Sequence, residues 1–178
     1  MTRLLMFSGG VESTALLHML DPAKDYIGII DLRTEVDIIP DHDLDMQNKI
    51  LSFFGFKNVC ICNMNMNYVE GMGGGDTSSQ YQPFAELLVA KLPNVTELWW
   101  GCHNQDSHDE AKWSRFRQAW KLMHPHCAVL QPLQHLSKKE QWELIDDNIK
   151  EYVISCYQHH PEIKGNCKMC EDRKLIHG

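Results

Sequence analysis

Short apolar runs alternate along the chain with longer stretches in which apolar residues recur at the spacing of a helix. The apolar runs predict five strands, at residues 3–7, 26–31, 59–64, 97–102 and 127–133. The periodic stretches predict helices over residues 12–20, 44–54, 82–92, 109–123 and 137–148. Such alternation is typical of βαβ units, whose strands form a parallel sheet. We therefore expect an α/β fold in which a parallel sheet of about five strands is flanked by helices.

Two segments depart from this alternation. Residues 71–79 ("GMGGGDTSS") are too rich in glycine for a strand or a helix, and they predict a loop that is either a lid over a site or a plain surface linker. After Tyr152 the periodicity ends and a Cys/His-rich tail begins. We expect residues 1–152 to form the main domain and residues 153–178 to be an appendage of it. Before this tail, Ser137 and Glu140 stand at the capping-box spacing and predict the start of the last helix.

The composition is that of a soluble globular protein. Of the 178 residues, 43% are hydrophobic and 23% are charged, which allows one domain with a genuine core. No apolar run reaches membrane-spanning length, and glycines interrupt the first residues, "RLLMFSGG", where a secretory leader would stay apolar. We expect a cytoplasmic location and no membrane partner. The net charge of −7 does not favour nucleic acid as a partner.

The first expected strand leads into a sequence suited to holding phosphate. Residues 7–14 read "FSGGVEST" and run directly into the first expected helix. Glycines let the backbone approach a phosphate closely, and a helix start offers free N–H groups there. Further donors are the hydroxyl groups of Ser8, Ser13 and Thr14. The spacing fits neither a Walker loop nor a G-x-G-x-x-G fingerprint, and an ordinary capped turn is the alternative.

This stretch resembles the SGG-x-D-S signature of the PP-loop ATP pyrophosphatases. The resemblance implies a Rossmann-like fold of the adenine nucleotide alpha hydrolase (HUP) type and cleavage of ATP between its α and β phosphates. It also implies that a substrate oxygen is adenylated, that pyrophosphate leaves, and that a nitrogen or sulfur nucleophile displaces AMP. The implied ATP-binding residues are Phe7, Ser8, Gly9, Gly10, Glu12, Ser13 and Thr14. Glu12 and Ser13 are the expected catalytic residues, and Glu12 would help to hold Mg²⁺, which pairs carboxylates with phosphate oxygens.

The end of the fourth expected strand is a second candidate part of the site. Gly101 stands where the backbone must leave room for the nucleotide, and polar residues 103–106 follow on the same rim. Ordinary loop polarity explains those residues about equally well. Trp99 and Trp100, just before them, alternate along the strand and are expected in the core. Four other cysteines are expected as buried thiols, namely Cys60, Cys62, Cys102 and Cys127.

The tail carries a pattern of zinc ligands. Cys167 and Cys170 have the C-x2-C spacing that offers two thiolates from one tight turn. Cys156 is the expected third ligand, and the candidates for the fourth are His159 and His160, with His177 more remote. Zinc with four protein ligands has no open position, so we expect a structural Zn²⁺. Three reduced cysteines in a surface tail are the alternative.

Loop and tail together resemble the 7-cyano-7-deazaguanine synthases within the PP-loop group. That group ends in "SCY…C-x2-C-x2-C-x2-R", and here "SCY" (155–157), Cys167, Cys170 and Arg173 follow in the same order. Three further segments match in order: "YQPFAELLVAKL", "LWWGCHNQDS" and "LQPLQHLSKKEQWEL". The resemblance implies adenylation of 7-carboxy-7-deazaguanine, amide formation with ammonia, and dehydration to the nitrile. It implies ATP, Mg²⁺ and Zn²⁺ as cofactors and a small deazapurine with ammonia as substrates, and a homodimer is one option for the oligomeric state.

The chain departs from that pattern at several positions. Lys164 stands where the first cysteine of the triple knuckle would fall, so a histidine must complete the zinc site. Ala85 and Glu86 replace an Arg-Asn pair, which removes a cationic donor from the expected site. Glu12 is one methylene longer than the usual Asp. Two alternatives stay open: the same chemistry on another substrate or stopping at the amide, and a non-catalytic zinc-containing binding module.

Overall fold

The computed structural model of the protein describes residues 1–34, 42–66, 78–103 and 110–153. Within them, five strands form one parallel sheet in the order β3-β2-β1-β4-β5. The strands are β1 (Arg3–Met6), β2 (Tyr26–Thr34), β3 (Val59–Met66), β4 (Glu97–Trp99) and β5 (Ala128–Leu130). The α-helices are α1 (Val11–Leu16), α2 (His42–Phe54), α3 (Ser78–Lys91), α4 (Glu110–Met123) and α5 (Lys138–Glu143). Short 3-10 helices follow at Leu17–Met19 and Lys150–Tyr152. The expected parallel α/β sheet is confirmed.

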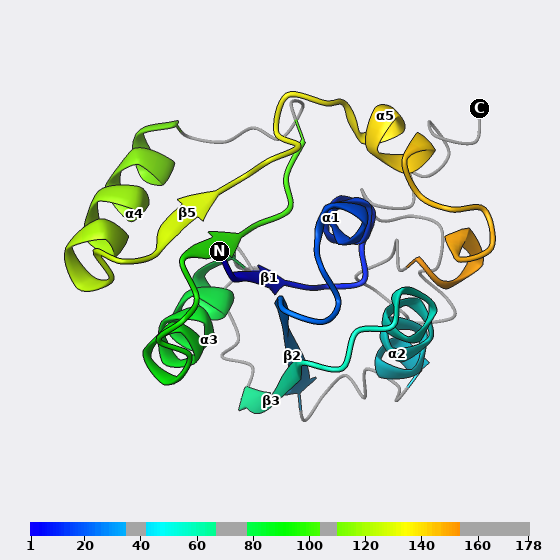
Figure 1. The fold of residues 1–178 in the computed structure, drawn as a ribbon, viewed down its shortest axis with the longest axis horizontal. Coiled ribbons are helices and arrows are strands. Elements are labelled where there is room, and N and C mark those ends of the chain that lie inside the picture. The colour runs from blue at the N-terminus through cyan, green and yellow to red at the C-terminus, as the bar shows by residue number, and fades with distance from the viewer. Residues whose placement is uncertain (35–41, 67–77, 104–109, 154–178) are drawn as a thin grey trace.

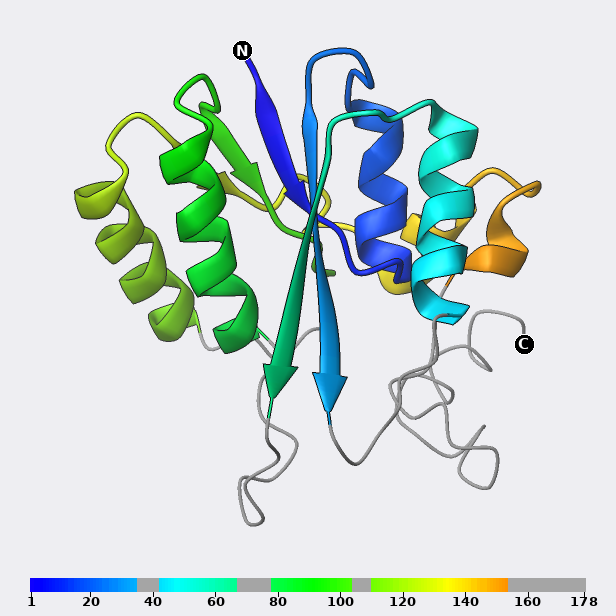
Figure 2. The same cartoon turned by 90° about the horizontal axis from the view of Figure 1, so that it is seen from below.

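Helices cover both faces of the sheet (Figures 1 and 2). α1, α2 and α5 lie on one face, and α3 and α4 lie on the other. An apolar core lies between each face of the sheet and its helices, because successive side chains of a strand point to opposite faces. In β1, Leu5 belongs to the core under α1 and Leu4 to the core under α3. Trp99 and Trp100 divide in the same way, and both pack against a core as predicted.

Strand lengths differ from expectation where backbone pairing decides them. β2 and β3 continue beyond their apolar runs to Thr34 and Met66, with Arg33 still in register with Asn65. These ends mix polar and apolar residues, so they carry no clear hydrophobic signal in the sequence. β4 and β5, in contrast, are shorter than the apolar runs that contain them.

The observed ends of the helices agree better with the capping and turn residues than with the ranges predicted from the spacing of apolar residues. The predicted capping box is confirmed: Ser137 Oγ accepts from the Glu140 N–H at 3.2 Å, and Glu140 accepts from the Ser137 N–H at 2.7 Å. α5 nevertheless ends well before residue 148. Asp146 closes a turn there by accepting a hydrogen bond from the N–H of Asn148 at 2.9 Å. α3 begins at Ser78, so the end of the glycine-rich segment 71–79 is helical, while the rest lies outside the described residues.

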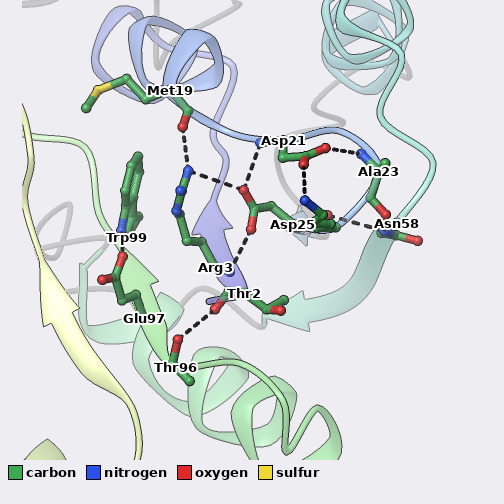
Figure 3. Close-up of polar contacts among 11 residues, drawn as sticks. Thr2, Arg3, Met19, Asp21, Ala23, Asp25, Asn58, Thr96, Glu97 and Trp99 are labelled. Carbon is green, nitrogen blue, oxygen red and sulfur yellow. Dashed lines mark hydrogen bonds and ion pairs between the residues drawn. The ribbon is translucent and has the colours of Figure 1, made fainter.

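A buried carboxylate holds together the amino end of the sheet (Figure 3). Asp25 is 1% exposed and accepts hydrogen bonds from the backbone N–H groups of Arg3 and Asp21, both at 2.8 Å. The guanidinium of Arg3 lies 3.4 Å from the same carboxylate and stacks over Trp99, 5.0 Å from the ring centroid. This cluster lies at the start of β1, whereas the glycine turn follows the end of that strand, so the cluster stabilises the fold without belonging to that site.

Candidate functional site

The strand order creates a switch point between β1 and β4. Within the sheet, β2 and β3 follow β1 on one side of it, and the chain then crosses over to place β4 and β5 on the other side of β1. In open parallel sheets, ligands bind beyond the carboxyl ends of the strands at such a point. The segments that leave these two strands are residues 7–10 and residues 100–103, which contain several of the predicted site residues.

A glycine turn joins β1 to α1. Gly9 has a φ of 78°, in the left-handed region that side chains disfavour, so this position requires glycine. The hydroxyl oxygens of Ser8 and Ser13 lie 3.1 Å apart, and Ser8 Oγ accepts a hydrogen bond from the Gly10 N–H at 3.3 Å. Gln47 of α2 donates to the Ser8 carbonyl at 2.9 Å. The turn is thus held in shape by its own hydroxyl groups and by an amide from α2.

The start of α1 has no side-chain cap. Gly10 is the N-cap residue, and its carbonyl accepts a hydrogen bond from the Thr14 N–H at 2.9 Å. The N–H groups of Val11, Glu12 and Ser13 precede that bond and have no intrahelical partner, as at any helix start. Such groups, beside a glycine turn, suit an anion. The Thr14 hydroxyl is buried and has no hydrogen-bond partner among the described residues, and its contact with a nucleotide stays a prediction.

Glu12 lies between an ammonium group and an imidazole. Its Oε1 is 3.2 Å from Nζ of Lys138 on α5 and 3.6 Å from Nε2 of His103. All three side chains are mostly buried: 17% of Glu12, 7% of Lys138 and 9% of His103 is exposed. Both contacts fall on the same oxygen, Oε1. A carboxylate fits the donor chemistry of Mg²⁺.

Lys138 is a site residue that sequence reasoning missed. It opens α5, a position usually exposed, but α5 packs against α1 (Figure 1). This packing brings Lys138 to Glu12. The sequence does hold one signal. Lysine in the first turn of a helix opposes the helix dipole, and a local rule broken in this way often marks a functional position.

Gly101 lies against the start of α1. A Cβ at this position would come within 2.9 Å of both the Glu12 Cβ and the Ser13 backbone nitrogen. Glycine therefore lets the segment after β4 approach α1 closely, which is a different reason from the predicted room for a nucleotide. Contact between Gly101 and a nucleotide stays a prediction.

Other predicted site residues lie in the core or outside the described residues. Phe7 is fully buried, so only its backbone borders the turn, where its N–H donates to the Gly28 carbonyl at 2.8 Å. The five expected zinc ligands lie outside the described residues: Cys156, His159, His160, Cys167 and Cys170. Zinc in the tail therefore stays a prediction. Within residues 1–153 as described, no group of three or more His, Cys, Asp or Glu side chains is arranged to hold a metal ion.

The remaining cysteines are buried less uniformly than predicted. Cys102 and Cys127 are buried, but Cys60 and Cys62 are only half-buried. Both belong to β3, an edge strand, whose side chains are covered less completely than those of a central strand. Burial raises the pKa of the Cys127 thiol to about 11 and also raises the pKa of Cys60. Both thiols are protonated at neutral pH, so neither is a reactive nucleophile in the folded protein.

Two solved structures share this fold over nearly the whole chain. One is the U34-tRNA thiolase NcsA from Methanococcus maripaludis with its [4Fe-4S] cluster, at 14% identity and a TM-score of 0.55. The other is a 4-thiouridine synthetase in complex with RNA and bound ATP, at 17% identity and a TM-score of 0.57. Each alignment covers 98% of this chain but only 64% and 52% of the respective neighbours. No family model and no curated protein matches the sequence.

At this level of identity the likeness establishes the fold alone. The chain has the Rossmann-like α/β fold of these neighbours, with a five-stranded parallel sheet between two layers of helices. At its switch point lie a glycine turn and a partly buried cluster of Glu12, Lys138 and His103. Among the helices that the structure describes, none has the length and apolarity needed to span a bilayer.

Proposed function

We propose that the protein is an enzyme of the PP-loop ATP pyrophosphatase type, which cleaves ATP between the α and β phosphates. One observation carries the proposal: the "SGGVES" turn follows β1 at the switch point, and its Glu12 faces Lys138 and His103. The fold shared with a synthetase that has bound ATP supports it.

Each group has its own role in this proposal. The backbone N–H groups at the start of α1, together with Ser8, bind the pyrophosphate end of ATP. Glu12 would hold Mg²⁺, and the cation would supply charge neutralisation at the phosphate oxygens. Lys138 offsets the negative charge of Glu12 in a largely buried setting, and His103 lies beside the same oxygen of Glu12. The chain's contribution is positioning and charge stabilisation rather than covalent catalysis.

For the substrate we propose 7-carboxy-7-deazaguanine, with ammonia as the nucleophile and the nitrile as the product. The support is the order of sequence motifs, which resembles that of the 7-cyano-7-deazaguanine synthases from Ser8 to Arg173. A structural Zn²⁺ in the tail belongs to the same proposal. The net charge of −7 accords with a small-molecule substrate in place of a nucleic acid.

One observation favours a second candidate, in which the same chemistry serves another substrate or stops at the amide. Ala85 is fully buried in the core beneath α3, and Glu86 accepts a hydrogen bond from Gln82 Nε2 at 2.9 Å. Neither position presents a cation, although the synthase pattern has an Arg-Asn pair there. Two of the structural neighbours are a tRNA thiolase and a 4-thiouridine synthetase, so sulfur is one alternative nucleophile.

A single incubation separates these candidates. The protein is mixed with ATP, Mg²⁺, ammonium and 7-carboxy-7-deazaguanine, and the nucleotides and bases are identified by mass spectrometry. AMP with the nitrile supports the first candidate, and AMP with the amide alone supports the second. If no AMP forms with any deazapurine, two candidates remain: the same chemistry on another substrate, and the non-catalytic binding module.

A pair of variants tests the assignment of the site. Glu12→Gln keeps the shape of the side chain but removes its charge, so we expect AMP formation to fall by about 100-fold. Glu143→Gln changes an exposed carboxylate on α5 and should leave the rate unchanged. Ser13→Ala should also abolish AMP release with the fold intact, because it removes the hydroxyl that meets Ser8. Equal rates in Glu12→Gln and Glu143→Gln would place the chemistry elsewhere.

A further inference from the structure

We propose that Gln141 is a positioning residue of this site, holding His103 and Lys138 in place around Glu12. The catalytic consequence rests on the proposed function, whereas the contacts that carry the inference do not involve ATP. Gln141 lies on α5, and its side chain is fully buried.

The amide of Gln141 joins segments that are distant in the sequence. Its Nε2 donates to the Cys102 carbonyl at 2.7 Å and to the Leu133 carbonyl at 2.9 Å, with a longer contact to the Leu136 carbonyl at 3.5 Å. These carbonyls belong to the segment after β4 and to the segment between β5 and α5. An amide end surrounded by carbonyl oxygens must be the donor end, so the contacts themselves determine its orientation.

This amide connects the two partners of Glu12. The Cys102 carbonyl is part of the peptide bond to His103, so the hydrogen bond restrains the peptide that carries the imidazole. Lys138 lies three residues before Gln141, on the same side of α5. One side chain therefore sets the distance between the loop that carries His103 and the helix that carries Lys138. Both of these residues meet the same oxygen of Glu12.

Packing alone does not account for glutamine at this position. The Oε1 of Gln141 is buried and has no hydrogen-bond partner among the described residues. A buried polar atom without a partner is unfavourable relative to an apolar atom in the same place. Methionine has the same length and lacks that atom, but it also lacks the donor to Cys102 and Leu133. The donor is the property of Gln141 that we assign to the site.

The first test compares Gln141→Met with Ile145→Val, which trims a buried residue of the core under α1. The readout is the Mg²⁺ concentration that gives half-maximal AMP formation. We expect it to rise by about 10–100-fold in Gln141→Met, as for other residues that orient a metal ligand. Ile145→Val should keep the wild-type value, since a packing loss alone leaves the orientation of Glu12 intact.

The second test needs no ATP. NMR signals of the His103 ring, recorded at one pH and assigned by their loss in His103→Gln, report on the surroundings of the imidazole. We expect them to shift in Gln141→Met and to stay in place in Ile145→Val. Gln141→Glu keeps the shape of the side chain but replaces the donor by an acceptor, so it should shift them too. It also serves as the test variant if the methionine variant does not fold.

The outcomes separate this inference from the proposed function. Unchanged His103 signals and an unchanged Mg²⁺ requirement in the Gln141 variants would overturn the inference, and so would equal changes in Ile145→Val. If the wild-type protein forms no AMP, the proposed function fails and the NMR result alone decides. Shifted His103 signals in the Gln141 variants then support the positioning role, and unchanged signals overturn it.

Discussion

Gly101→Ala tests how the site is built, because Gly101 lies so close to the start of α1. The added Cβ would lie 2.9 Å from the Glu12 Cβ, 2.9 Å from the Ser13 nitrogen and 3.0 Å from the Glu12 carbonyl carbon. Two of these three atoms are backbone atoms, which cannot rotate away as a side-chain tip can. Gly101 is not among the described glycines with positive φ, so alanine would not be strained by its own conformation. Steric contact is therefore the main penalty, and either α1 or the segment after β4 must move.

The size of the effect follows from this contact. Overpacking of this kind costs about 1–3 kcal/mol. A chain of this size loses about 2–4 °C in Tm per kcal/mol, so we expect Gly101→Ala to melt about 2–12 °C below the wild type. The rate of AMP formation should fall by more than the lost stability explains, because the movement displaces Glu12 from Lys138 and His103. A displacement on the order of 1 Å in a reacting site costs about 100-fold in rate, and we expect AMP formation to fall by that amount.

Two other glycines provide matched controls, with Tm followed by circular dichroism and AMP by chromatography. Gly28→Ala would place a Cβ 2.8 Å from the Leu88 Cδ1 and 3.1 Å from the Met6 Sδ, which are side-chain atoms in the core under α3. Gly55→Ala meets nothing within 4 Å, and its φ of 76° alone costs about 1–2 kcal/mol. Both should lower Tm and keep AMP formation. Gly101→Ala with the activity of Gly28→Ala at equal stability would refute the reasoning.

Three further predictions concern stability and metal content. Asp25→Ala leaves two backbone N–H groups and the Arg3 guanidinium without their acceptor, so the free energy of unfolding measured with urea should fall by about 3–5 kcal/mol. The exposed control Asp147→Ala should lose less than about 0.5 kcal/mol. Similar losses in the two variants would contradict the role of Asp25. The raised pKa of Cys127 means that the folded state favours the thiol, so its contribution to stability is present below pH 9 and is lost as the pH rises toward about 11. Urea unfolding between pH 8 and 11 measures this loss, which Cys127→Ala should reduce, and an identical pH profile in that variant would argue against it. The full chain should contain about one zinc by elemental mass spectrometry, lost in Cys167→Ser together with stability, and a zinc-free, fully folded wild type would exclude the site.

Strands and helix starts could be predicted from the sequence where burial or a local hydrogen bond dictates the residue type. The apolar runs of β1, β2 and β4 coincide with strands because the centre of a parallel sheet is buried on both faces, so these residues must be apolar. The ends of β2 and β3, where polar and apolar residues mix, escape this rule, because the ladder there, which includes Arg33 and Asn65, depends on backbone pairing. The capping box at Ser137 and Glu140 was predictable because its two partners are neighbours in the chain.

The sequence by itself determined the features that depend on neighbouring residues: the strand–helix alternation, the glycine turn at Ser8–Gly10, and the start of α5. Only the tertiary structure decided that Lys138 and His103 both meet Glu12, and that Gln141 holds their two segments together. These contacts arise because β4 lies beside β1 in the sheet and α5 packs on α1. Spacing along the chain carries no information about such distances, since the order of strands and the packing of helices set them.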